Sequence, residues 1–155
     1  MTKPLAVITG ASSGIGEATA KAFSNAGYPT LLLARRIEIM ESFNLKNSIC
    51  KKIDVRDRDA LVSAIREAEK QYGPTDMMFN NAGVARLADI STQDPSEWDE
   101  MIDVNTKGVM NGIYAVMKDM KARQSGTIVN MSSIAGRKVY GCLLYTSPSP
   151  RDATL

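Results

Sequence analysis

The sequence predicts an α/β protein with a doubly wound parallel sheet of the Rossmann type. Short apolar runs of strand length alternate with helical stretches, a glycine-rich turn follows the first run, and two arginines follow the second. With 155 residues, 44% of them hydrophobic, the chain is long enough for one globular domain with a core. Repeated β-α-β units with right-handed crossovers place helices on both faces of such a sheet.

Five apolar runs bounded by turn residues are expected to form the strands. They are Leu5 to Thr9, Thr30 to Leu33, Ser48 to Ile53, Met77 to Asn80 and Thr127 to Met131. Their lengths and their separation by helical segments favour parallel pairing over a meander of hairpins.

The ends of the first two helices can be read from their flanking residues. Gly14 to Ala26 is expected to be helical and to stop at Gly27. The next helix is expected over Arg58 to Tyr72, with Asp57 as its N-cap and Gly73-Pro74 closing it.

A third, longer helix has a clear start. Asp94 stands at the N-cap position, Pro95 at the first helical position and Glu97 two residues later, which together predict a capping box. The helical pattern then continues toward Arg123, with an apolar stripe available for packing on the sheet.

Charge and composition exclude several classes of function. The chain has 19 Lys and Arg against 17 Asp and Glu, spread without a block of one sign, so neither a nucleic-acid groove nor a membrane-surface patch is expected. The start of the chain lacks a signal peptide or a membrane span, which favours the cytoplasm. With no His and only Cys50 and Cys142, no metal site and no Ser-His or Cys-His pair is expected.

The glycine-rich turn is the strongest chemical signal in the sequence. It follows the first predicted strand directly and opens a helix, where free backbone N–H groups attract a pyrophosphate. The alternative is a tight strand-to-helix turn without a ligand. The turn has the spacing Gly-x-x-x-Gly-x-Gly, with glycines at positions 10, 14 and 16.

The end of the second strand indicates which dinucleotide binds. About twenty residues beyond the glycines, where a carboxylate would hold a ribose 2′-hydroxyl, the sequence has Arg35 and Arg36. Two guanidiniums suit a 2′-phosphate and favour NADP(H) over NAD(H), although a solvated arginine pair is the simpler alternative. Asp54 and Val55 close the third strand, where a carboxylate accepts from an adenine amino group or is an ordinary turn residue.

Together with Asn80-Asn81-Ala82-Gly83 after the fourth strand, these features resemble the short-chain dehydrogenase/reductase family. The resemblance spans essentially Pro4 to Gly141. It implies hydride transfer between NADP(H) and a small carbonyl or secondary alcohol substrate, in an enzyme that usually forms homo-oligomers. The same resemblance implies a set of cofactor contacts along all four turns. They are Gly10, Ser12, Ser13, Gly14, Ile15, Gly16, Arg35, Arg36, Asp54, Val55, Asn81, Ala82 and Gly83.

Two catalytic positions follow from the resemblance. Asn105 matches the family Asn that bends its helix and holds a water in a proton relay. Ser133 matches the Ser that hydrogen-bonds the substrate oxygen. Taken singly, an Asn within a helix or a Ser after a strand is more often a cap or turn residue.

The family's catalytic Tyr and the Lys four residues after it are missing from the expected place. Tyr145 is close to that place, but position 149 is Ser, and Pro148 and Pro150 do not suit a helix interior. Tyr140 also fails, because residue 144 is Leu.

The C-terminal run from Cys142 to Asp152 resembles an in-frame translation of a transposase-end sequencing adapter. The alternative is a natural Ser/Pro-rich tail. Because of the adapter resemblance, we expect residues 1–141 to form an incomplete NADP-binding domain and residues 142–155 to be a non-native, disordered tail. Such a C-terminally truncated fragment is expected to bind its cofactor weakly, to lack normal turnover, and to leave a sheet edge and one face of the long helix uncovered.

Two other functions remain open. A non-catalytic NADP(H)-binding module would keep the glycine turn and Arg35 but dispense with Tyr-x-x-x-Lys. An extended-type relative acting on nucleotide sugars is disfavoured by the form of the glycine motif. Leu87 to Gln93 is expected to contribute one wall of a substrate pocket.

Overall fold

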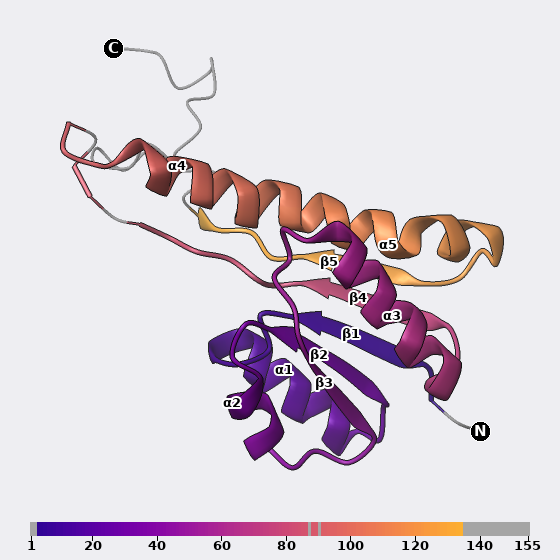
Figure 1. Cartoon of the computed structure of the whole chain (residues 1–155). Helices are drawn as coiled ribbons and strands as arrows, with labels where there is room; N and C mark the ends of the chain where they lie inside the picture. Colours follow the sequence, from indigo (N-terminus) through magenta and orange to yellow (C-terminus); the bar gives the residue numbers. More distant parts are fainter. Residues whose placement is uncertain (1–2, 87, 90, 135–155) are drawn as a thin grey trace.

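The computed structural model describes residues 3–86, 88–89 and 91–134. Its centre is one parallel sheet with the strand order β3-β2-β1-β4-β5 (Figure 1). The strands are β1 (Leu5–Thr9), β2 (Thr30–Ala34), β3 (Ser48–Lys52), β4 (Thr75–Asn80) and β5 (Thr127–Asn130). This order reverses between β1 and β4, so the predicted doubly wound α/β class is confirmed.

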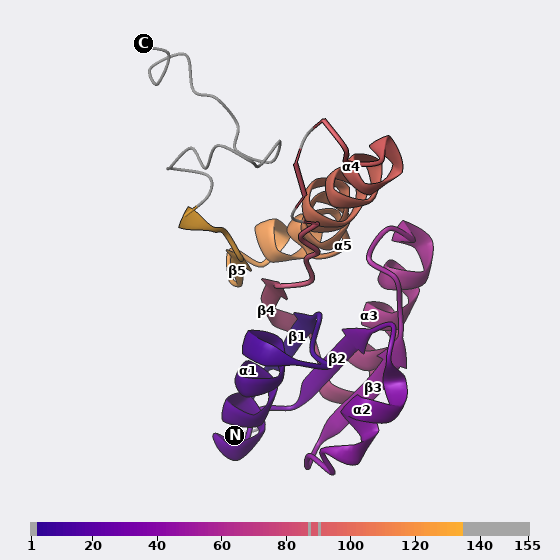
Figure 2. The same ribbon diagram turned by 90° about the vertical axis from the view of Figure 1, so that its left-hand side faces the viewer.

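Helices cover both faces of the sheet. The helices are α1 (Gly14–Asn25), α2 (Ile37–Ser42), α3 (Arg58–Tyr72), α4 (Pro95–Ile102) and α5 (Gly108–Ala122). Figure 2 shows α1 and α3 on opposite sides of the sheet, and α5 lies beside α3. The layers are those that a parallel sheet needs to be buried on both faces.

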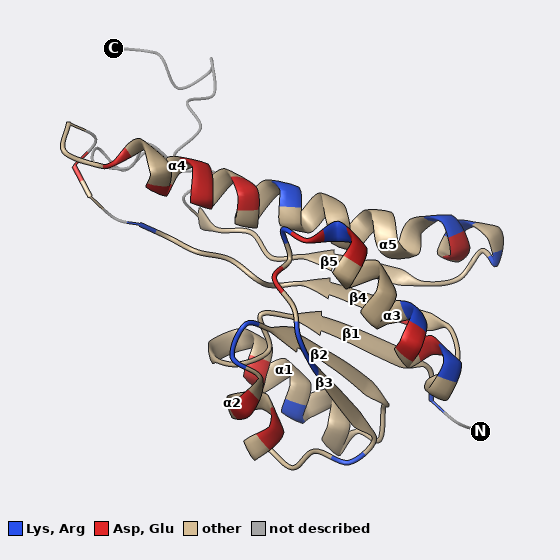
Figure 3. Cartoon of the chain, viewed as in Figure 1, with Lys and Arg blue, Asp and Glu red and all other residues tan. Residues whose placement is uncertain are grey.

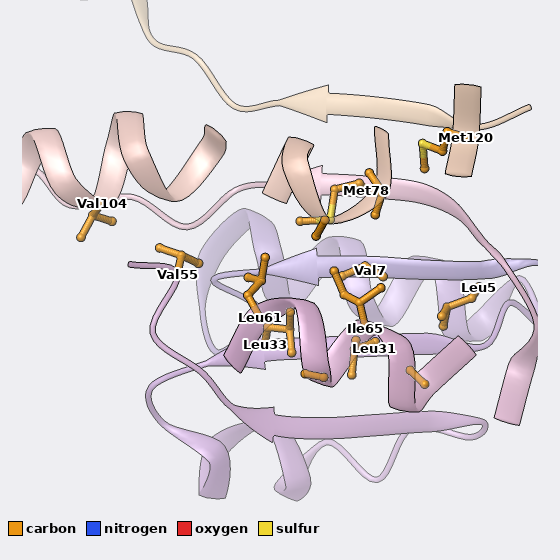
Figure 4. Packing of buried hydrophobic residues seen from close by; sticks show 14 residues of the cluster. Leu5, Val7, Leu31, Leu33, Val55, Leu61, Ile65, Met78, Val104 and Met120 are labelled. Carbon is orange, nitrogen blue, oxygen red and sulfur yellow. The ribbon is translucent and has the colours of Figure 1, made fainter. Parts of the chain in front are cut away.

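The two halves of the core follow from the alternation of side chains along each strand. Leu31 and Leu33 pack with Ile65 of α3 on one face (Figure 4). Leu32 packs with Ala20 of α1 on the other face. All five of these residues are fully buried. Burial of each large aliphatic side chain contributes about 2 kcal/mol, so β2 holds both layers on the sheet.

The predicted helix starts are confirmed in geometry. The Asp57 carboxylate accepts a hydrogen bond from the backbone N of Ala60 at 2.9 Å, and the Asp94 carboxylate accepts from the N of Ser96 at 2.8 Å. In a capping box the Glu97 carboxylate would accept from the backbone N of Asp94. The contact seen for Glu97 is instead with the side-chain amide of Gln93, which donates to it at 3.2 Å.

Three details differ from the predictions. The helix predicted as one α-helix toward Arg123 contains a π-helical turn, η1 (Asp103–Lys107), between α4 and α5. Helix α2 was not predicted, because six residues are too few to show a helical period. Strand β4 begins at Thr75 rather than Met77, since pairing with β1 extends it.

Part of the outer surface is apolar. Met110, Tyr114 and Met117 of α5 are exposed, and so is Val129 on β5 at the edge of the sheet. These are the helix face and the sheet edge that were expected to be uncovered. In the described part of the chain, no helix has the length and apolar character needed to cross a bilayer.

Candidate cofactor site

A cavity of about 600 Å³ opens where the carboxyl ends of β1, β2, β3 and β4 meet. This is the edge at which open parallel sheets bind ligands. All of the predicted cofactor residues except Gly14 and Gly16 line it. The lining consists of Gly10, Ser12, Ser13, Ile15, Leu33, Ala34, Arg35, Arg36, Ile53, Asp54, Val55, Asn81, Ala82, Gly83, Val84, Val104 and Met131.

The glycine-rich turn lines this cavity with Gly10, Ser12, Ser13 and Ile15. A Cβ atom on Gly16 would lie 2.3 Å from the carbonyl oxygen of Gly10, so a side chain there is excluded. Gly14 has a φ of +58° and open space around its Cα, at the first turn of α1. Backbone amides at a helix start with no side chain above them fit a pyrophosphate.

Ser13 stands at the N-cap of α1 but does not cap it through its side chain. Its hydroxyl accepts a hydrogen bond from Nη2 of Arg36 at 3.0 Å, and the hydroxyl of Ser12 accepts from the same nitrogen at 3.1 Å. The helix N-terminus therefore keeps its orphan donors for an anion, and the guanidinium of Arg36 lies next to it.

A buried threonine joins the turn after β1 to the turn after β4. The hydroxyl oxygen of Thr9 accepts hydrogen bonds from the backbone N of Asn81 and of Ala82, both at 3.0 Å, and donates to the carbonyl of Phe79 at 3.3 Å. The side-chain amide of Asn81 donates back to the carbonyls of Thr9 at 3.0 Å and Gly10 at 3.3 Å. Sequence reasoning missed Thr9; a polar residue at the last position of an otherwise apolar strand was the available signal.

Asp54 is held as a carboxylate at the end of β3. Arg56 donates to both of its oxygens, and this side-chain hydrogen bond, with the charges of Arg56 and Arg35, outweighs burial and keeps the pKa of Asp54 below its ordinary value. An ionised carboxylate accepts hydrogen bonds only. Asp54 is therefore suited to the acceptor role that the sequence predicted for it.

Asn111, which the sequence analysis did not single out, anchors the loop that carries Val55. Its buried side-chain amide donates to the carbonyl of Val55 at 2.9 Å and of Arg56 at 3.3 Å, while its oxygen accepts from Nε of Arg58 at 2.9 Å. The wall of the cavity after β3 is thus fixed from α5, more than fifty residues away in the sequence.

Replacing Asn111 with Ala is expected to lower the free energy of unfolding by about 2–3 kcal/mol, because two carbonyls and a guanidinium lose a buried partner. Urea unfolding followed by circular dichroism measures this. Asn25→Ala, at the exposed end of α1, is the control and is expected to change stability by less than about 0.5 kcal/mol. Equal effects of the two substitutions would contradict the anchoring role.

The two predicted catalytic residues lie on different elements. Asn105, in η1, accepts from the backbone N of Val84 at 2.9 Å and donates to its carbonyl at 2.8 Å. It thus fixes the chain that follows Asn81-Ala82-Gly83. Ser133 is exposed just beyond β5, at the carboxyl edge of the sheet. The role of Asn105 in a proton relay and that of Ser133 toward a substrate stay predictions.

Among residues 3–86, 88–89 and 91–134, no three metal-ligating side chains come together. Tyr140, Tyr145, Ser149 and the tail predicted from residue 142 lie outside the described residues. Residues 87 and 90 of the predicted substrate wall lie outside them as well.

Comparison with known proteins identifies relatives along most of the chain. The family model described as short chain dehydrogenase matches residues 4–147. An uncharacterised oxidoreductase of Listeria monocytogenes is 41% identical over 140 residues, which cover 86% of this chain and 56% of that protein. Acetoacetyl-CoA reductase of Paracoccus denitrificans is 38% identical over 136 residues, with the same two coverages. The chain thus spans little more than half the length of these relatives.

Solved structures show the same likeness. The closed form of serine dehydrogenase complexed with NADP+ superposes with a TM-score of 0.84 at 29% identity, over 89% of this chain and 57% of that one. A metagenomic short-chain oxidoreductase in complex with NADP gives a TM-score of 0.81 at 31% identity, over 88% and 65% of the two chains. With its sheet order, its glycine-rich turn and this family match, the chain belongs to the short-chain dehydrogenase/reductase family of oxidoreductases.

Proposed function

We propose that this chain is the cofactor-binding part of an NADP(H)-dependent oxidoreductase that interconverts a carbonyl and a secondary alcohol on a small molecule. The observation that carries the choice of NADP(H) is the pair Arg35 and Arg36, which lines the cavity where an NAD(H)-binding protein would place a carboxylate. The NADP bound to the two neighbouring structures supports the same choice.

Each part of the dinucleotide has a matching set of residues in this cavity. The backbone amides at the start of α1, where Ser13 and Ile15 line the cavity, would hold the pyrophosphate. Arg35 and Arg36, with the Ser12 and Ser13 hydroxyls, would hold the 2′-phosphate. Asp54 would accept from the adenine amino group, and Asn81-Ala82-Gly83 would border the ribose and nicotinamide.

When bound, the nicotinamide supplies or accepts the hydride. In our proposal Ser133 orients the substrate oxygen by a hydrogen bond, and Asn105 holds the turn after β4 and a relay water. Proton exchange would require the family's Tyr, with its pKa lowered by a nearby Lys. We infer that residues 1–141 form an incomplete domain that lacks this pair and that residues 142–155 are a non-native tail.

The charge of the arginine pair gives a direct test. Arg35→Gln/Arg36→Gln is expected to weaken binding of adenosine 2′,5′-bisphosphate roughly 10- to 100-fold, because each guanidinium–phosphate contact is charge-assisted. Binding of adenosine 5′-monophosphate, which lacks only the 2′-phosphate, is expected to stay within about twofold. Isothermal titration calorimetry measures both affinities.

Lys118→Gln/Lys121→Gln is the matched control, since it removes the same charge from the exposed end of α5 away from the cavity. It should leave both affinities unchanged. Equal weakening of the two nucleotides by the arginine variant would contradict recognition of the 2′-phosphate.

The second candidate is a non-catalytic NADP(H)-binding module. It applies if the Ser/Pro-rich tail is natural, because position 149 then holds Ser where the family has Lys. Sequencing the source transcript across the Gly141 codon, with primers independent of the adapter, separates the two functions. Tyr-x-x-x-Lys within a few codons supports the oxidoreductase. A genuine stop after the Ser/Pro tail supports the module.

We further propose a cytoplasmic homo-oligomer that binds neither nucleic acid nor membrane. The exposed Met110, Tyr114 and Met117 on α5 support assembly through this helix, because a stripe of this kind is typical of an interface. Residues 87–93 are proposed as one wall of the substrate pocket.

A further inference from the structure

The two arginines that follow β2 have partners of different charge. Arg36 donates to two neutral hydroxyls, on Ser12 and Ser13. Nη1 of Arg35 lies 3.7 Å from Oε1 of Glu100, a carboxylate on α4. Figure 3 shows the basic segment after β2 and the acidic residues along α4. The positive charge of Arg35 is therefore partly offset by a residue from another element.

Glu100 is held in this place by a third arginine. Nε and Nη2 of Arg86 donate to Oε2 of Glu100 at 3.1 and 2.9 Å, which leaves Oε1 directed to Arg35. The Glu100 side chain is only 22% exposed, against 57% for that of Arg35. Its charge also contributes to raising the pKa of Arg56, behind the larger effect of Asp54. The carboxylate is thus held among guanidiniums, and Arg35 is the more exposed of the two arginines that contact it.

We propose that Glu100 is a specificity-determining residue whose carboxylate competes with the cofactor's 2′-phosphate for Arg35 and so narrows the preference for NADP(H) over NAD(H). This inference rests on the proposed function, in which Arg35 and Arg36 recognise that phosphate. A 2′-phosphate must draw Arg35 away from Glu100 or share it, whereas a 2′-hydroxyl leaves the ion pair intact. Glu100 therefore weakens the binding of the cofactor that carries a 2′-phosphate and not of the cofactor that carries a 2′-hydroxyl.

The size of the effect follows from the exposure of the pair. Ion pairs that are partly open to water are weak, so releasing Arg35 is expected to improve phosphate binding by roughly two- to fivefold rather than by orders of magnitude. Glu100→Gln is the variant of choice, because it keeps the shape of the side chain and an oxygen acceptor for Arg86.

The test is a double-mutant cycle on the full chain, read out by calorimetric binding of adenosine 2′,5′-bisphosphate and adenosine 5′-monophosphate. Glu100→Gln should raise the affinity for the bisphosphate roughly two- to fivefold. It should leave the affinity for the monophosphate equal to that of the starting protein. In an Arg35→Gln background the gain should fall to less than half. Glu67→Gln, which removes a carboxylate from its pair with Lys51 on the α3 side, is the control and should change neither affinity.

Glu100→Asp provides a second variant that keeps the charge but shortens the reach to Arg35, and it should act in the same direction as Glu100→Gln. An unchanged bisphosphate affinity in both variants, with the starting protein still preferring the bisphosphate, would overturn this inference alone. The same gain with and without Arg35 would indicate general repulsion rather than competition, and would overturn it too. Equal binding of the two nucleotides by the starting protein would instead overturn the proposed NADP(H) preference, and this inference with it.

Discussion

Thr9→Val is expected to lower the free energy of unfolding by about 1–3 kcal/mol, although the two side chains have nearly the same shape. The Thr9 hydroxyl is the acceptor for two backbone amides, those of Asn81 and Ala82, and the position is 2% exposed. Valine would leave the backbone N of Ala82 without this acceptor, while that of Asn81 would keep only the carbonyl of Phe79 at 3.1 Å, at a total cost of about 1–3 kcal/mol. Urea unfolding followed by circular dichroism measures the loss.

Thr75→Val is a matched control on the neighbouring strand. Thr75 is also fully buried, but its hydroxyl oxygen has no hydrogen-bond partner among the described residues. Removing that hydroxyl is therefore expected to be neutral or to stabilise the protein, by up to about 1 kcal/mol. If both valine variants lost the same stability, the role of Thr9 as the link between the two turns would be wrong.

Gly16→Ala is expected to cost about 3 kcal/mol of stability and to weaken dinucleotide binding roughly tenfold or more. The new methyl group would lie 2.3 Å from the Gly10 carbonyl oxygen and 2.5 Å from the Asn81 amide nitrogen. Because the first of these atoms belongs to the backbone, the whole phosphate-binding turn must shift. Thermal unfolding and calorimetric titration with NADPH measure the two effects.

Gly27→Ala separates this clash from ordinary backbone strain. Gly27 has a φ of +79° and open space around it, at the end of α1 away from the cavity. Its replacement should cost about 1 kcal/mol of stability and leave NADPH binding unchanged. A comparable loss of binding in both variants would argue against a tight fit at Gly16.

Most of the fold follows from local signals in the sequence. The alternation of strands and helices, the caps at Asp57 and Asp94 and the stop at Gly27 all lie in short windows. The π-helical turn at Asp103–Lys107 follows only in part. The family resemblance implies a bend at Asn105, but the widened geometry accompanies contacts of Asn105 with Val84, which lies 21 residues away in the sequence. Helix α2 was missed because it is too short to show a period.

The candidate site divides in the same way. The glycine turn and the arginine pair could be predicted, because each is recognisable from residues that are consecutive in the sequence. Thr9, Asn111 and Glu100 could not, since each acts through partners more than ten residues away that only the folded chain brings near. Their residue types, a buried Thr and Asn and a helix Glu, are common in proteins without such roles.

Hydrogen–deuterium exchange with and without saturating NADPH tests most directly whether the cavity at the carboxyl edge of the sheet is the cofactor site. The account predicts slower exchange in peptides covering residues 10–16, 34–36, 53–56 and 81–84, and no change over residues 117–122 at the far end of α5. NADH at the same concentration should protect residues 34–36 less. Protection elsewhere, or no protection at any saturating concentration of NADPH, would contradict the proposed cofactor site.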